Sequence, residues 1–219
     1  MSVKSLDSNS NIQILPELLK NQIAAGEVVT RPKDVVKEIM ENARDAGADS
    51  LHLEIKEGGV SLISLRDNGK GIAKEELHLA LTAHATSKIR ELSDLDSVET
   101  MGFRGEALAS IASVSRVSLA SKPSQQGHGW VIHASKDQFD RNQIKPSSIQ
   151  EGTQIEIKDL FFNTRSRREF LSSSSVEARH IEEVVKKMAL ANPRLTISFS
   201  TEKKSKNMQA GGGLQDMDR

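Results

Sequence analysis

Two apolar-rich runs joined by a short turn sequence give the clearest pattern in the chain. In residues 51–56, LHLEIK, every second side chain is apolar, and residues 60–67, VSLISLRD, form the second run. A period of two is typical of strands that bury one face. The intervening residues 57–59 are a turn sequence, so the two runs predict a β-hairpin. The same pattern predicts further strands at residues 116–121, 129–135, 152–160 and, as the last strand, 194–200.

A helical period of apolar residues marks the segment after Pro32. At about 100° per residue, from 3.6 residues per turn, the apolar side chains of residues 35–46 fall on one arc. Proline suits the first turn of a helix, and Gly47 suits its end. Further helices are predicted at residues 16–28, 74–83, 106–114 and 176–191. Because helices separate groups of turn-linked strands, we expect an α+β fold, a two-layer sandwich with helices on one face of a mixed sheet.

The composition is that of a globular protein with loose ends. The chain has 219 residues, of which 37% are hydrophobic, and this is enough for one domain with a real core. We expect the folded domain at residues 12–200, between a flexible arm at residues 1–11 and a flexible tail or linker at residues 201–219. The abrupt Gly-rich finish favours a piece of a longer protein.

Charge, cysteine content and apolar runs exclude several classes of protein. The 30 Lys and Arg residues balance 30 Asp and Glu residues, so the chain lacks the cationic field of a protein that coats DNA. The absence of cysteine excludes disulfides and thiolate zinc sites. The longest apolar run is four residues, 188–191, and the N-terminus has no apolar signal core. We expect a cytoplasmic protein with no membrane segment.

One edge of the helix after Pro32 carries polar residues that could meet a ligand. Glu38, Asn42 and Asp45 stack about one turn apart, beside the apolar arc. At the border of a buried face, two carboxylates and an amide can contact a ligand that is partly shielded from water. The alternative is a solvated helix edge, which is what such spacing usually indicates, so this pattern alone does not establish a site.

A buried carboxylate is expected where the predicted hairpin ends. Asp67 has the strand parity of Ile63 and Leu65, so it faces the core if they do. A carboxylate at the margin of a core requires a hydrogen-bond donor, and a bound amino group such as that of adenine would serve. Because Asn-Gly at residues 68–69 is common turn chemistry, a plain turn is the alternative. Glycines at the positions of ligands exclude a calcium loop.

A glycine-rich segment precedes the helix predicted at residues 106–114. Gly102 and Gly105 would let backbone N–H groups approach an anion at the start of that helix. This is phosphate-binding geometry without a Walker motif, which the chain lacks. An ordinary loop is the alternative.

Together, these segments resemble the GHKL ATPase superfamily and, within it, most closely the MutL mismatch-repair family. The superfamily also includes the gyrase B subunit, the large heat-shock chaperone and histidine kinases. The matching segments are NQIAAGEVVTRP (21–32), ENARDAGAD (41–49), DNGKGI (67–72), AHATSKI (83–89), MGFRGEALASI (101–111) and GTQIEIKDLFFNT (152–164). They extend over residues 12 to about 200, and they imply the Bergerat ATPase fold.

The resemblance implies a role for each residue singled out above. Glu38 corresponds to the general base that activates the attacking water, Asn42 to the ligand of the Mg²⁺ that bridges the ATP phosphates, and Asp67 to the acceptor of the adenine amino group. Gly71 and Thr153 would complete the adenine pocket, and Asp45 lies near it. The implied phosphate contacts are Lys88, which is otherwise a surface lysine, and the lid residues Gly102, Phe103, Arg104, Gly105, Glu106, Ala107 and Leu108.

The resemblance also implies a slow ATPase cycle with protein partners. ATP would order the lid and the segment at residues 12–29, and two domains would close into a homodimer. The dimer would relay signals from a mismatch-recognition protein to a nuclease or helicase, with DNA held mainly by regions beyond Arg219. The apolar stripe in residues 12–29 has a second interpretation, packing on its own domain. Two other functions stay open: a dimerisation module without turnover, and a histidine-kinase-like catalytic domain, which would need an acceptor histidine and should lack GFRGEAL.

The sequence departs from the MutL pattern after residue 163. Where the family has Pro-Ala-Arg, this chain reads Thr164-Arg165-Ser166-Arg167-Arg168. The departure concerns the rigidity of this loop and leaves the ATP chemistry untouched. Its arginines would contact a phosphate backbone or form a solvated basic loop.

Overall fold

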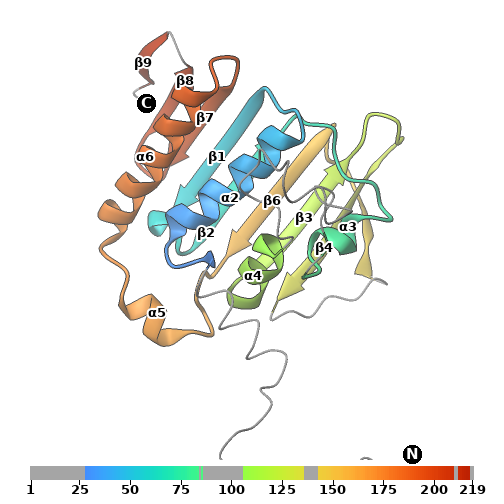
Figure 1. The fold of residues 1–219 in the computed structure, drawn as a ribbon, viewed down its shortest axis with the longest axis horizontal. Coiled ribbons are helices and arrows are strands. Elements are labelled where there is room, and N and C mark those ends of the chain that lie inside the picture. Colours follow the sequence, from blue (N-terminus) through green and yellow to red (C-terminus); the bar gives the residue numbers. More distant parts are fainter. Residues whose placement is uncertain (1–27, 84, 86–105, 136–142, 210–211, 218–219) are drawn as a thin grey trace, which may run out of the picture.

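A single sheet forms the frame of the molecule (Figure 1). The computed structural model describes residues 28–83, 85, 106–135, 143–209 and 212–217, with backbone only for Ser135 and residues 212–217. Within these residues the sheet has nine strands in the order β5-β4-β3-β6-β2-β1-β7-β8-β9. Pairing is parallel between β1 and β7 and antiparallel elsewhere, so the mixed sheet is confirmed. The strands are β1 (Ser50–Lys56), β2 (Leu62–Asp67), β3 (Arg116–Lys122), β4 (Gly129–Ser135), β5 (Lys145–Ser147), β6 (Gly152–Lys158), β7 (Thr196–Thr201), β8 (Ser205–Gln209) and β9 (Gly212–Met217).

Helices cover one face of this sheet, as expected for two layers. In Figure 1, α2, α4 and α6 lie across the same face. Strand β1 shows why, because Leu51, Leu53 and Ile55 are buried while the residues between them are exposed. One face is therefore core and the other is open to solvent. The helices are α2 (Pro32–Asp45), α3 (Leu77–Ala80), α4 (Ala107–Val114), α5 (Arg165–Glu169) and α6 (Ser174–Ala191), with a short 3-10 turn η1 (Glu57–Gly59) between β1 and β2.

The helix α2 forms where proline and the apolar arc predicted it. Its first turn is capped by Asp34, whose Oδ2 accepts hydrogen bonds from Thr30 N at 3.0 Å and Arg31 N at 2.9 Å. Arg31 also donates from Nη1 to Glu177 Oε1 at 2.6 Å, which ties the start of α2 to α6. The apolar arc packs against the sheet and α6. These contacts set the position of the polar edge of α2.

Several elements differ from the expectations. The predicted helix at residues 74–83 is reduced to the four residues of α3, and β5 and α5 lack a periodic apolar signal that would have revealed them. The flexible tail expected from residue 201 is wrong for β8 and β9, which extend the sheet beyond β7. Met208 is the one buried residue of β8, so this strand has no apolar period that would have revealed it in the sequence. The helix predicted at residues 16–28 and the arm at residues 1–11 lie almost wholly outside the described residues.

None of the helices in the described part of the chain is long and apolar enough to cross a lipid bilayer.

Candidate functional site

The register of three strands places Asp67 among core residues. Asp67 is paired with Thr153 of β6, and Thr153 is paired with Ser121 of β3. The side chains of Ile63 and Leu65 are buried on the helix-covered face, and Asp67 follows their parity with only 8% of its surface exposed. The expectation that this carboxylate faces the core is confirmed.

Backbone donors hold one oxygen of the Asp67 carboxylate. Its Oδ1 accepts from Gly69 N at 2.8 Å and from Thr153 N at 3.3 Å. Burial raises the pKa of Asp67, while these two backbone hydrogen bonds act in the opposite direction. Among the described residues, both hydrogen bonds of this side chain end on Oδ1. Oδ2 is therefore available to accept from a ligand at the edge of the core.

Two glycines allow the backbone to close around Asp67. At Gly152 φ is +109°, and a Cβ there would lie 2.0 Å from Asp67 O. At Gly71 φ is +72°, and a Cβ would lie 2.7 Å from Lys122 O. Both neighbours are backbone atoms, so neither can give way as cheaply as the end of a flexible side chain. Gly71 was predicted as a site residue, whereas Gly152 was not, although it begins the strand predicted at residues 152–160.

We call the residues that surround this carboxylate, Asp67, Gly71, Gly152 and Thr153, the Asp67 wall. Ser121 also belongs to this wall, and sequence reasoning did not identify it. Its hydroxyl is fully buried and lies within hydrogen-bond distance of Ile72 N at 2.8 Å, Gly152 O at 2.9 Å and Thr153 Oγ1 at 2.9 Å. The serine therefore joins the segment after Asp67 to the start of β6. A polar residue with the inward parity of Val117 and Leu119 was the signal that could have revealed it.

Asn68 has a structural role next to the site. Its Oδ1 accepts from Asp49 N at 3.1 Å and Ser50 N at 3.0 Å, and its Nδ2 donates to Asp49 Oδ1 at 2.7 Å. Residues 68–69 thus take part in the expected turn, and Asp67 beside them is also buried. The two interpretations of this segment are compatible.

The C-terminal end of α2 lies beside the Asp67 turn. Lys70 N donates to Ala46 O at 3.0 Å, immediately after the helix. The predicted residues Glu38 and Asn42 are half-buried on α2, one turn apart and on the approach to this turn. Asp45 is also half-buried, and its Oδ1 accepts from Arg44 Nη2 at 2.8 Å. Part of Asp45's charge is therefore already balanced by its own neighbour.

Only part of the predicted phosphate-binding segment falls within the described residues. Glu106 immediately precedes α4, and Ala107 and Leu108 form its first turn, so the helix start is confirmed. All three are half-buried. The other predicted phosphate contacts lie outside the described residues: Lys88, Gly102, Phe103, Arg104 and Gly105.

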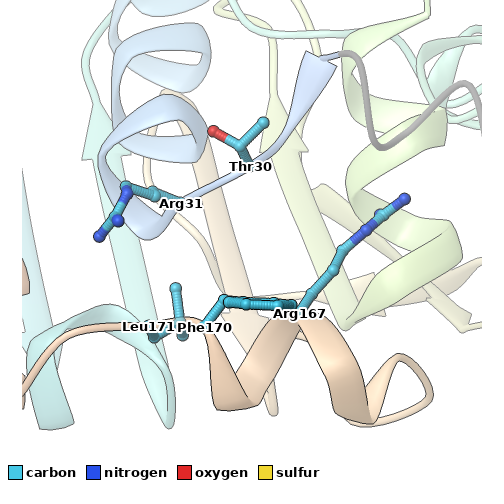
Figure 2. A pocket seen from close by; sticks show the side chains of 5 residues that line it. All are labelled: Thr30, Arg31, Arg167, Phe170 and Leu171. Atoms are coloured by element: carbon cyan, nitrogen blue, oxygen red, sulfur yellow. The ribbon is translucent and has the colours of Figure 1, made fainter.

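A cavity of about 230 Å³ lies at the opposite end of α2 (Figure 2). Figure 2 shows residues from the segment entering α2 facing residues from α5 and the turn after it: Thr30, Arg31, Arg167, Phe170 and Leu171. The 14 residues of α2 separate this cavity from the Asp67 turn by about 20 Å, at 1.5 Å per residue. The cavity contains none of the predicted site residues, so it is distinct from the Asp67 wall.

No cluster of three or more His, Cys, Asp or Glu side chains suited to a metal ion occurs in the described part of the chain. A cation here would therefore depend on few protein ligands. Mg²⁺ accepts such a site when substrate phosphates and water complete its shell. The amide of Asn42, which is half-buried on α2, offers one suitable oxygen.

Comparisons with known proteins agree with this arrangement. The family model described as histidine kinase-, DNA gyrase B- and HSP90-like ATPase matches residues 30–166. The DNA mismatch repair protein MutL of Histophilus somni is 52% identical over 88% of this chain and 31% of its own length. MutL of Colwellia psychrerythraea is 53% identical over 86% of this chain and 28% of its own length. The chain thus spans less than a third of the curated relatives it matches.

A solved structure extends the likeness to three dimensions. The Aquifex aeolicus MutL ATPase domain complexed with ADP has a TM-score of 0.65 and 31% sequence identity, over 84% of this chain and 66% of that chain. Fold, family model and relatives agree with the resemblance seen in the sequence motifs. The chain therefore belongs to the family of histidine kinase-, DNA gyrase B- and HSP90-like ATPases, and within it corresponds to the ATPase domain of the MutL proteins.

Proposed function

We propose that this chain binds and slowly hydrolyses ATP with Mg²⁺, as the N-terminal ATPase domain of a MutL-type mismatch-repair protein. The observation that carries the proposal is the buried Asp67 carboxylate, with Oδ1 held by backbone donors and Oδ2 available. The ADP named in the Aquifex aeolicus structure supports a nucleotide as the ligand. Turnover distinguishes this proposal from a dimerisation module that only binds nucleotide.

The base of the nucleotide would rest against the Asp67 wall. The adenine amino group donates to Asp67 Oδ2, which supplies the donor that this buried carboxylate lacks on its second oxygen. Gly71 and Gly152 bring the backbone close enough to shape the pocket, since a side chain at either position would meet a carbonyl. Thr153 completes this wall beside Asp67.

The phosphates would run from this wall along α2. Asn42 would hold Mg²⁺ through its amide oxygen. Glu38, one turn further from the Asp67 wall, orients and deprotonates the attacking water. Lys88 and the lid residues 102–108 would contact the phosphates, and Asp45 would lie near the nucleotide. Bound Mg²⁺ supplies charge neutralisation at the phosphates.

The relatives support a proposal for the partners of the whole protein. We propose that ATP promotes homodimerisation of the domain, and that the dimer links a mismatch-recognition protein to a downstream nuclease or helicase. DNA contacts would come mainly from other regions of the protein. The support for this is the name shared by the relatives, DNA mismatch repair protein MutL.

The metal assignment predicts the effect of Asn42→Ala. We expect this variant to weaken Mg²⁺-dependent binding of an ATP analogue by about tenfold or more, the loss of roughly one polar contact. Titration calorimetry with and without Mg²⁺ measures the effect, together with phosphate release by the parent chain. Asn192→Ala is the control, because the Asn192 amide is already used to cap the end of α6 through Met188 O. Equal Mg²⁺ dependence in both variants would remove Asn42 from this role, and absence of phosphate release by the parent would favour the dimerisation module.

A further inference from the structure

The hydroxyl of Ser121 lies within hydrogen-bond distance of three partners at the Asp67 wall. It lies 2.8 Å from Ile72 N, 2.9 Å from Gly152 O and 2.9 Å from Thr153 Oγ1, with no exposed surface. A serine hydroxyl has one proton to donate and two lone pairs that accept. These contacts therefore use its full capacity.

The chemistry of the partners fixes which atom donates in each contact. Ile72 N–H can only donate to Ser121 Oγ, and Gly152 O can only accept from it. The single proton of Ser121 is therefore committed to the carbonyl of Gly152. In the remaining contact, between Ser121 Oγ and Thr153 Oγ1, Thr153 has to be the donor.

These hydrogen bonds determine which donors and acceptors of the Asp67 wall remain to contact a bound base. The Thr153 hydroxyl has given its proton to Ser121, so only its lone pairs remain. The Thr153 N–H and the Gly69 N–H are both engaged by Asp67 Oδ1, and Ile72 N–H is engaged by Ser121. An ionised Asp67 carboxylate only accepts. Asp67 and Thr153, which are neighbours across β2 and β6, thus present acceptors side by side.

We propose that Ser121 is a positioning residue that sets base specificity, by orienting the Thr153 hydroxyl so that the wall accepts from a 6-amino purine and rejects a 6-oxo purine. The amino group of adenine has two N–H donors, which match two acceptors. A 6-oxo base would bring a carbonyl oxygen against these acceptors, and the lone pairs would face one another. The inference rests on the proposed function, because it specifies the base recognised at the same wall.

The test compares two nucleotides that differ at this position. Non-hydrolysable analogues of ATP and of inosine triphosphate, which carries a 6-oxo group, are titrated with Mg²⁺ into the parent chain and Ser121→Ala. In the variant the Thr153 hydroxyl is free to rotate and donate. We expect the ratio of ATP to inosine triphosphate affinity to fall about tenfold, the equivalent of one hydrogen bond. Equal weakening of both nucleotides, or an unchanged ratio, would overturn the proposal.

Further variants separate positioning from a general loss of structure. Ser115→Ala is the matched control, because Ser115 is also fully buried and precedes the other end of β3, with its hydroxyl bonded to Ile111 O. This control should keep the parent ratio. Thr153→Val removes the acceptor itself and should lower the ratio, and adding Ser121→Ala to it should lower the ratio no further. Additive effects in the double variant would contradict a role exerted through Thr153.

The outcomes also distinguish this inference from the proposed function. A parent chain that binds neither nucleotide contradicts the proposed function. A parent chain that binds both nucleotides equally keeps nucleotide binding and contradicts the specificity inference alone. If Ser121→Ala does not fold, Thr153→Val still tests the inference. An unchanged ratio of ATP to inosine triphosphate affinity in that variant would overturn the role of the Ser121 and Thr153 hydroxyls.

Discussion

Replacing Glu38 with alanine is expected to lower phosphate release by about 10²- to 10⁴-fold, the usual contribution of a general base. Nucleotide affinity should stay within about threefold, because the base contacts the attacking water in the hydrolytic step and contributes little to holding the ligand. Glu38 lies on α2 one turn from Asn42, on the half-buried edge of the helix. Steady-state phosphate release and titration calorimetry on the same preparation measure the two effects.

Glu41→Ala is the control for this prediction. Glu41 belongs to the same helix and is also half-buried, but its Oε1 lies 3.9 Å from Lys37 Nζ, in a pair along the helix. This variant should keep the parent rate of phosphate release. Similar residual rates in Glu38→Ala and in the parent chain would show that another group activates the water.

The second large effect is expected at Gly152. A Cβ at this position would lie 2.0 Å from Asp67 O and 2.9 Å from Asn68 Cα, and the backbone has φ of +109°. Gly152→Ala therefore adds both backbone strain and a collision with main-chain atoms. We expect the free energy of unfolding to fall by about 3 kcal/mol or more, the sum of the strain and overpacking costs. Urea denaturation measures the fall.

Gly47→Ala separates the two costs. Gly47 also has a positive φ, +80°, but a Cβ there would meet nothing within 4 Å. This variant should therefore lose only about 1 kcal/mol, the strain without the collision. If Gly152→Ala costs no more than Gly47→Ala, the β6 backbone is able to move away from Asp67, and the close crossing is not required for the fold.

Local sequence signals were sufficient to predict the central elements of the fold. The hairpin of β1 and β2 and the helix α2 each combine a strong period with a suitable terminus, and both formed within two residues of the expected limits. The burial of Asp67 could be predicted because successive side chains of a strand point to opposite faces of the sheet. In each case neighbours in sequence decide the conformation, so composition and spacing are enough.

Non-local contacts explain what the sequence did not reveal. Strands β8 and β9 lack a clear apolar alternation in the sequence, and their places in the sheet are set by pairing with β7 and with each other. Ser121 is 32 residues from its partner Thr153, and no local pattern joins them. Gly152 is required because of a carbonyl on a different strand. Such residues become recognisable only after the strand order is known.

The candidate site was predictable in outline through its motifs. The fold brings Asp67, Gly71 and Thr153 to one wall, and it places Asn42 and Glu38 on the adjacent helix. The roles of these residues in ATP chemistry, and those of Lys88 and the lid, stay predictions. A likeness in motif identifies the residues, whereas their function has to be measured with the ligand present.

The most direct test is titration calorimetry, in which a non-hydrolysable ATP analogue is added with Mg²⁺ to the parent chain and to Asp67→Ala. The central claim is that an adenine base donates to the buried Asp67 carboxylate. Saturable heat from the parent chain and an affinity about 10- to 100-fold weaker in Asp67→Ala would agree with the loss of a hydrogen bond to a charged group. No heat from a folded parent chain, or equal affinity in both, would contradict it.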